Sequence, residues 1–266
     1  MSERWKRVRE SLGSASAPLV NVLDGVGTTV HLTVQTVIWT FRRPFRPAQI
    51  MSMMEFIGVQ SLFIISLTGA FSGMVLALQT VTSLRRLQQE ALVGGIVVVG
   101  LMREISPVFA GLMVTARAGS AMAAELGNMR VTEQIDAITT MSVSPVQYLL
   151  SPRLVSAIVM LPLLCVLYTV VGTVGAYVVA VKWLNVDPGS FIEKIQQFAQ
   201  PQDLWMGIIK SAVFGFLISS ISCRQGYYAS GGARGVGEAT TRAVVQSAVA
   251  ILISNYIITS LLTPGM

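Results

Sequence analysis

Residues 101–138 read LMREISPVFAGLMVTARAGSAMAAELGNMRVTEQIDAI, and this stretch decides the fold class. The segment from Ala91 to Ala116 that contains its first part is apolar, apart from the adjacent charges Arg103 and Glu104. A hydrocarbon layer about 30 Å thick needs about 20 helical residues to cross it. We therefore expect one membrane-spanning helix here, with two charges near its middle.

Four further windows outside this stretch are long and apolar enough to span a membrane. Phe56–Leu84, Leu154–Val181 and Ala243–Met266 carry no charge, and Leu204–Cys223 carries only Lys210. The pattern predicts an all-α integral membrane protein with five transmembrane helices, over residues 56–84, 91–117, 154–181, 204–223 and 243–263. We expect an interfacial or cytoplasmic N-terminal segment over residues 1–50 and a transmembrane domain over residues 51–266.

The composition excludes several other classes of protein. Hydrophobic residues make up 53% of the chain and charged residues only 12%, whereas soluble domains carry about 25% charged residues. The basic residues form short clusters between apolar stretches, which does not favour nucleic-acid binding. Cys165 and Cys223 lie in apolar runs, and His31 is the single histidine. The chain therefore offers no disulfide scaffold and little material for metal or triad chemistry.

An N-terminal amphipathic helix is predicted ahead of the first span, between Gly25 and Phe41. At 100° per residue its apolar side chains form one stripe, with His31, Thr36 and other polar residues outside it. We expect this helix to lie in the membrane interface, with His31 on its polar side. The stripe consists of Val26, Val30, Val34, Val37, Ile38 and Phe41, and the expected anchors at lipid head groups are Arg42, Arg43 and Arg46.

The distribution of Lys and Arg predicts the orientation, because cytoplasmic loops carry the excess. The N-terminal region, the second connection and the fourth connection fall on one side of the five spans and hold most of the basic residues. We therefore expect a cytoplasmic N-terminus and an external C-terminus. The basic residues of the first side are Arg4, Lys6, Arg7, Arg9, Arg42, Arg43, Arg46, Arg117, Arg130, Arg153, Arg224, Arg234 and Arg242, and those of the other side are Arg85, Arg86, Lys182, Lys194 and Lys210.

Arg103 and Glu104 need an explanation, because a charge near mid-membrane costs about 2.5 kcal/mol or more unless it is paired or hydrated. They either tie two helices together or line a polar cavity or a lipid head-group site. Adjacent helical residues point about 100° apart and cannot both face one partner, which favours the cavity slightly. Pro107 removes a backbone hydrogen bond and should kink the helix beside them.

The segment after the second span predicts a short helix over residues 132–142. Thr132 is placed to cap it, with Ile135, Ile138 and Met141 on or near one face and Glu133, Gln134 and Asp136 exposed. A short amphipathic helix on the cytoplasmic side is what a permease needs to enter a groove of a soluble ATPase. A lid lying on the membrane surface remains the alternative.

Small residues mark places where helices approach closely or turn. Gly69 and Gly73 lie one turn apart in the first span, and Gly119 belongs to a run of small residues after the second. The glycine-rich fourth connection, GYYASGGARGVGEATTRAVV, lacks the lysine and preceding strand of a phosphate-binding loop. We expect it to form a tight, flexible turn that re-enters the membrane.

Enzymatic alternatives have weak support in the sequence. Ser120 follows Gly119, but the only histidine lies in the interfacial segment and no Ser–Lys pair shares a span depth. A lipid-modifying transferase would need clustered aspartates for a metal, and Asp24, Asp136, Asp187 and Asp203 are scattered.

The quoted stretch resembles the signature of the MlaE/YrbE permeases. Arg-Glu, a proline three residues later, A/G-R-x-G-S-A and A-E-x-G-x-M-x-x-x-E-Q follow one another in that family's order. FSGMVLALQ at Phe71–Gln79, LPLL at Leu161–Leu164 and GARGVGEATTRAVV at Gly232–Val245 also match. The resemblance extends from about Leu62 to about Leu262.

The resemblance implies the permease subunit of an ATP-powered lipid transporter in the bacterial inner membrane, with phospholipid as the usual cargo. Such permeases form dimers with a second copy, bind a cytoplasmic ABC ATPase and associate with a periplasmic MCE-domain protein; some systems add a STAS-domain subunit. This chain would need no cofactor of its own, because the ATPase binds ATP and Mg²⁺. The implied role is to maintain outer-membrane lipid asymmetry.

The resemblance also assigns roles to individual residues. Glu133 and Gln134, with Arg130 and Asp136 beside them, are expected in the region that meets the ATPase. The residues expected to border the lipid pocket at the dimer centre are Leu76, Gln79, Leu84, Arg103 and Glu104. An intramembrane lipid-modifying enzyme and a permease for a soluble solute remain the alternative functions.

Overall fold

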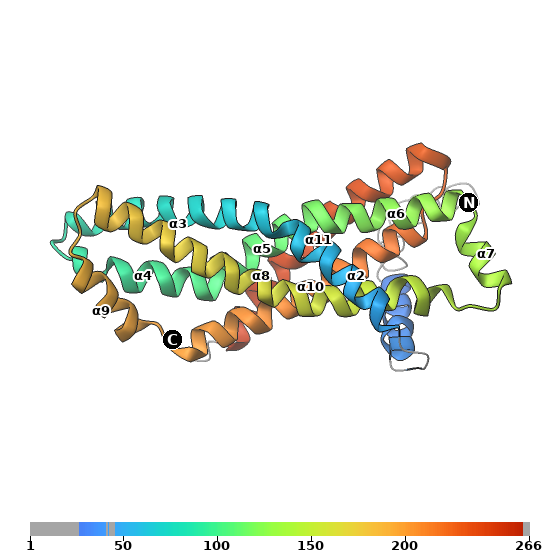
Figure 1. Ribbon diagram of the computed structural model, residues 1–266, viewed down its shortest axis with the longest axis horizontal. Coiled ribbons are helices and arrows are strands. Elements are labelled where there is room, and N and C mark those ends of the chain that lie inside the picture. Colours follow the sequence, from blue (N-terminus) through green and yellow to red (C-terminus); the bar gives the residue numbers. More distant parts are fainter. Residues whose placement is uncertain (1–26, 41, 43–45, 263–266) are drawn as a thin grey trace, which may run out of the picture.

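The computed structural model describes residues 27–40, 42 and 46–262, and every regular element in these ranges is helical. Five continuous helical segments are long and apolar enough to span a membrane (Figure 1). The expected all-α membrane fold with five spans is therefore confirmed. Val26, Phe41, Arg43 and the basic residues before residue 27 lie outside the described residues.

The five spans are built from the following elements. Span one joins α2 (Pro47–Ile57), η1 (Val59–Ser61) and α3 (Leu62–Arg85). Span two consists, in chain order, of η2 (Glu90–Leu92), α4 (Val93–Gly100), η3 (Leu101–Ile105), α5 (Ser106–Val114), η4 (Thr115–Gly119) and α6 (Ser120–Val131). Span three joins η5 (Val146–Leu150), α8 (Ser151–Tyr177) and η6 (Val178–Trp183). Spans four and five are α10 (Pro201–Tyr227) and α11 (Gly232–Leu262).

The helices extend beyond the predicted apolar windows. The second span continues to Val131 and the third begins at Val146, whereas the sequence suggested ends near residues 117 and 154. The added turns carry polar side chains that find partners in the fold. One example is Arg153, whose Nη2 lies 2.7 Å from Oε2 of Glu125. Hydropathy marks where a helix can meet hydrocarbon, and it does not mark where the helix ends.

The core forms where α8 packs between α3 and α10 (Figure 1). Small residues allow these backbones to approach. A Cβ added to Gly73 would lie 1.9 Å from the carbonyl oxygen of Gly172, and one added to Gly175 would lie 2.5 Å from that of Ala70. The glycines of the first span therefore lie against α8 of the same chain.

The second span is one continuous helix that contains two π-helical turns. The first, η3, contains Arg103 and Glu104, and the second, η4, contains Arg117 and Gly119. Pro107 follows η3 in the first turn of α5. A π turn inserts an extra residue and changes the direction of the side chains around it, and such turns are frequent at functional sites.

The two connections at the ends of span four differ from each other. Between spans three and four lies α9 (Pro188–Phe198), which Asp187 caps by accepting a hydrogen bond from the Ser190 N–H at 2.7 Å. Phe191 buries this helix against α4. The glycine-rich connection contains the expected tight turn, but the turn is limited to residues 228–231, and Gly232 already begins α11. Gly231 has a φ of 91°, which other residues rarely adopt.

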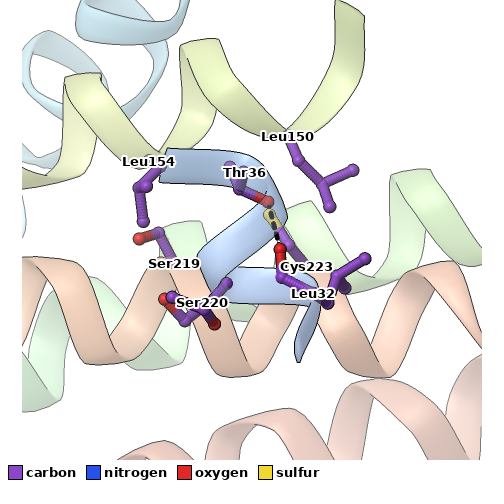
Figure 2. A pocket seen from close by; sticks show the side chains of 8 residues that line it. Leu32, Thr36, Leu150, Leu154, Ser219, Ser220 and Cys223 are labelled. Atoms are coloured by element: carbon purple, nitrogen blue, oxygen red, sulfur yellow. Dashed lines mark hydrogen bonds between the residues drawn. The ribbon is translucent and has the colours of Figure 1, made fainter. Parts of the chain in front are cut away.

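The N-terminal helix over residues 27–40 lies against α8 and α10. Figure 2 shows Leu32 and Thr36 facing Leu150 of η5 and Leu154 of α8, together with Ser219, Ser220 and Cys223 of α10. Thr36 is buried and donates to the Leu32 carbonyl oxygen at 2.7 Å. The protein-facing side of this helix therefore includes Thr36, whereas Val30, Val34 and Ile38 of the apolar stripe are more than half exposed.

Candidate functional site

The two charges of the second span both form ion pairs with α10. Nε of Arg103 lies 2.5 Å from Oδ1 of Asp203, and Oε1 of Glu104 lies 2.7 Å from Nζ of Lys210. The two partners are seven residues apart, about two turns along one helix. Although the side chains of Arg103 and Glu104 pair with different residues, both partners belong to the same helix. This geometry matches the first interpretation of the pair, a link between helices.

Lys210 is fully buried, and all three of its N–H groups have acceptors. Nζ donates to Oε1 of Glu104 at 2.7 Å, to the Arg103 carbonyl oxygen at 2.9 Å and to Oγ1 of Thr259 at 2.8 Å. An ammonium group has three donors and no acceptor, so this site satisfies it completely. The buried charge is thereby compensated within the span.

The fifth span completes the site through its last turns. Nδ2 of Asn255 donates to Oε2 of Glu104 at 3.0 Å, and Oγ1 of Thr259 lies 3.2 Å from Oε1 of the same carboxylate. Glu104 therefore receives hydrogen bonds from both α10 and α11. We call Arg103, Glu104, Asp203, Lys210, Asn255 and Thr259 the mid-span network.

Asp203 has a second role at the start of α10. Its Oδ2 accepts a hydrogen bond from the backbone N–H of Gln200 at 3.0 Å, as part of a capping box. Its side chain is only 2% exposed, whereas that of Arg103 is 44% exposed. Glu104 is likewise 39% exposed, although its partner Lys210 is fully buried. The network therefore presents the residues of the second span outward and buries their α10 partners.

Sequence reasoning missed four members of this network. Lys210 was counted among the external basic residues, and the structure instead buries it inside the protein. Asp203 is one of four scattered aspartates in the sequence, and no local pattern points to Asn255 or Thr259. A lysine within an apolar window is itself a signal, because a charge at that depth needs a partner.

The other residues expected in a lipid pocket lie on α3. Leu76 and Leu84 are partly buried against the main hydrophobic core, and Gln79 is exposed. Arg103 and Glu104 share one network, but the structure does not draw the α3 residues into it. Among the packing glycines, Gly69 lies against Tyr168 of α8, and Gly119 lies against Ser222 and Ile218 of α10.

The short helix after the second span is α7 (Gln134–Thr140). Thr132 does not cap it, contrary to the prediction: Thr132 ends α6, and its hydroxyl donates to the Asn128 carbonyl oxygen at 2.8 Å. The residue before α7 is Glu133, with a left-handed φ of 59°. An N-cap residue usually has an extended backbone, and Glu133 does not, so a side-chain cap of the usual kind does not form there.

The faces of α7 agree with the expected pattern in part. Ile135 is 1% exposed and packs with Leu126 and Leu150, and Ile138 is partly buried beside it. Met141, expected on or near the same face, lies just after the last residue of α7 and is 75% exposed. Glu133, Gln134 and Asp136 are exposed, and Oδ1 of Asp136 lies 2.7 Å from Nη1 of Arg130. The exposed polar residues of this region therefore gather at the junction between α6 and α7.

Two further arginines support the helices near this end of the molecule. Arg153 is 3% exposed and donates to the Leu149 carbonyl oxygen at 2.6 Å, in addition to its pair with Glu125. Arg117 donates to Oγ of Ser61 at 2.8 Å, and also to the carbonyl oxygen of Phe56. Both arginines are among the basic residues that the sequence places on the cytoplasmic side, and in the structure each contacts a neighbouring helix.

Comparison with known proteins agrees with this architecture. The family described as Permease MlaE matches residues 50–261. A probable ABC transporter permease protein of Rickettsia bellii is 42% identical over 242 residues, which cover 91% of this chain and 93% of that protein. The intermembrane phospholipid transport system permease protein MlaE of Haemophilus influenzae is 36% identical over 214 residues, 80% of this chain and 82% of that protein.

A plant relative extends the comparison beyond bacteria. The chloroplastic protein TRIGALACTOSYLDIACYLGLYCEROL 1 of Arabidopsis thaliana is 36% identical over 215 residues, 81% of this chain and 61% of that protein. The family match includes the two π turns of the second span, the mid-span network and α7. The resemblance that the sequence suggested is confirmed: this chain is a transporter permease of the MlaE family.

Proposed function

We propose that this chain is the membrane subunit of an ATP-driven transporter that moves phospholipid between the bacterial inner membrane and a periplasmic MCE-domain protein. The observation that carries the proposal is the 36% identity to the Haemophilus influenzae protein named for intermembrane phospholipid transport, over 80% of this chain. Two copies of the chain would form the membrane unit, and a cytoplasmic ABC ATPase would bind ATP and Mg²⁺. The consequence for the cell would be maintained outer-membrane lipid asymmetry.

The proposed orientation places α7 at the cytoplasmic face. With five spans, the first described helix and the end of α11 lie toward opposite ends of the molecule (Figure 1). Among the described residues, Arg130 at the end of α6, Arg224 at the end of α10 and Arg234 at the start of α11 lie at the α7 end (Figure 1), and cytoplasmic loops carry an excess of such residues. The N-terminus would then be cytoplasmic and the C-terminus periplasmic.

The ATPase would dock at the junction between α6 and α7. Glu133 and Gln134 are exposed there, and the buried Ile135 fixes α7 to the bundle. A helix that is held by its apolar face and presents polar groups outward can transmit a movement of its partner to the second and third spans. A STAS-domain subunit, where one exists, would join on the ATPase side.

The proposed lipid path runs along the exposed side of the mid-span network. Arg103 and Glu104 remain 44% and 39% exposed while their partners are buried, so each could contact a head group without losing its ion pair. Leu76, Gln79 and Leu84 would border the same path in the dimer and supply mostly apolar contact for acyl chains. ATP-driven movement of the first two spans would change the width of this path.

Replacing Glu133 and Gln134 by alanine tests the docking site. We expect the double variant to fold normally. When a tagged chain is purified from cells that also express the partner ATPase and the MCE-domain protein, little of the ATPase subunit should co-purify with the double variant. The matched control is Gln196→Ala, an exposed residue of α9 at the opposite end of the molecule. Unchanged co-purification together with normal transport would refute the docking role.

The cargo is tested by reconstitution with a fluorescent phosphatidylethanolamine. Proteoliposomes that contain the assembled complex should transfer this lipid to or from the MCE-domain protein only when ATP is present. A photo-crosslinker at Leu76 should capture phospholipid in the same complex. If the chain associates with no ATPase, or if the complex moves a soluble solute and no lipid, the proposed function is wrong.

A further inference from the structure

A large apolar hollow lies apart from the mid-span network, between the helix over residues 27–40, α10 and α11. Its volume is about 910 Å³, within the range of about 300–1,000 Å³ that is typical of ligand pockets. Each of the three helices contributes apolar side chains to its walls. Examples are Val30 and Val34, Phe216 and Ile221, and Val249 and Ile253.

The N-terminal helix turns part of its apolar stripe toward the hollow and away from the protein core. Its stripe residues Val30 and Val34 are 56% and 51% exposed, although the opposite side of the helix is buried against the protein. Across the hollow, Val249 and Ile253 of α11 are 50% and 57% exposed. Since the chain spans a membrane, these facing surfaces require an apolar occupant.

Polar groups without complete partners also line the hollow. Nε of Arg224 is buried and lacks a hydrogen-bond partner, and its Nη2 reaches only Oγ1 of Thr28 at 3.4 Å. In the described part of the chain, no carboxylate lies within ion-pair distance of Arg224. The hydroxyl of Ser220, a residue only 9% exposed, is also buried and lacks a hydrogen-bond partner. Arg224 belongs to the last turn of α10, at the α7 end of the molecule (Figure 1).

We propose that this hollow binds one anionic phospholipid, with acyl chains along the apolar walls and the head-group phosphate on the guanidinium of Arg224. A guanidinium binds phosphate through several N–H groups at once, and desolvation at such a site strengthens the charge interaction. A purely apolar helix from a second protein would leave Arg224 and Ser220 without partners, whereas a phospholipid supplies both an apolar body and an anion. The proposal depends on membrane insertion and not on the transport function, and its site is distinct from the proposed lipid path.

Photo-crosslinking in lipid nanodiscs tests the site with the permease alone. A benzophenone amino acid is placed at Val249 in the hollow or, as a control, at Leu252, which is 55% exposed on the same helix but does not line the hollow. The discs contain phosphatidylcholine with one tenth phosphatidylglycerol. We expect Val249 to capture phosphatidylglycerol at least fivefold above its molar share, and Leu252 to capture the two lipids in proportion to the bilayer.

Two variants separate head-group recognition from simple filling of the space. Arg224→Gln should abolish the enrichment at Val249, and Arg224→Lys should retain part of it because the positive charge remains. Val34→Trp keeps Arg224 but fills the hollow from the N-terminal helix, so it should also abolish the enrichment. This second variant tests the site independently if Arg224→Gln fails to fold. Proportional capture at Val249 in the unmodified chain, enrichment that survives Arg224→Gln, or a crosslink to a second copy of the chain would each overturn the proposal.

Discussion

Two regions of this protein use the same kind of ion pair in opposite surroundings. In the mid-span network the Lys210–Glu104 pair is separated by 2.7 Å, and the lysine is fully buried. At the junction between α6 and α7 the Arg130–Asp136 pair is also separated by 2.7 Å, but its side chains are 39% and 60% exposed. Distance alone therefore says little about what each pair contributes to stability, because burial sets the cost of leaving a charge alone.

The largest expected effect follows from removing the carboxylate that pairs with the fully buried Lys210. Glu104→Ala leaves the Lys210 ammonium with only the Arg103 carbonyl oxygen and Thr259 as partners. A buried charge that loses its counter-charge costs about 3–5 kcal/mol, so the free energy of unfolding should fall by that amount. Titration with sodium dodecyl sulfate in mixed micelles, followed by circular dichroism, measures it.

A double variant is the control for this prediction. Glu104→Ala combined with Lys210→Met removes both charges, so it should recover most of the lost stability. A single variant that loses less than about 1 kcal/mol would show that Lys210 does not need its partner, since exposed pairs contribute no more than this.

An intermediate effect is expected at the Arg153–Glu125 pair, because both of its side chains are somewhat more exposed than those of the Lys210–Glu104 pair. Arg153 is 3% exposed, whereas the side chain of Glu125 is 49% exposed. Glu125→Ala should lower the free energy of unfolding by about 1.5–3 kcal/mol, the cost of losing a hydrogen bond to a charged group. The same titration measures it, and Glu125→Gln should lose less because its amide oxygen can still accept from Arg153. A loss as large as that of Glu104→Ala would contradict the ranking by burial.

The smallest effect is expected at the exposed pair. Asp136→Ala should change the free energy of unfolding by no more than about 1 kcal/mol, because water and salt screen both partners. Repeating the titration at low and high sodium chloride checks this, since the difference between variant and unmodified chain should shrink with salt. A salt-independent loss of several kcal/mol would mean that this pair organises α7.

The sequence predicted two of the residues in the candidate site but not their partners. Arg103 and Glu104 were identified from their depth in an apolar window, because charges at such depth are costly. Their partners Asp203 and Lys210 lie about 100 residues further along the chain, and no local pattern connects them. Thr132 was misassigned for a related reason: a threonine can cap a following helix or end a preceding one, and only the backbone path decides.

The sequence by itself determined the five spans, the all-helical class and the family, because membrane thickness sets the length of an apolar helix and the signature is contiguous. Only the tertiary structure decided which charges are buried, that the glycines of α3 meet α8, and that the N-terminal helix, α10 and α11 enclose a hollow. These features depend on contacts between segments far apart in the chain. Each contact is fixed by how the helices pack, and the packing cannot be read from any one segment.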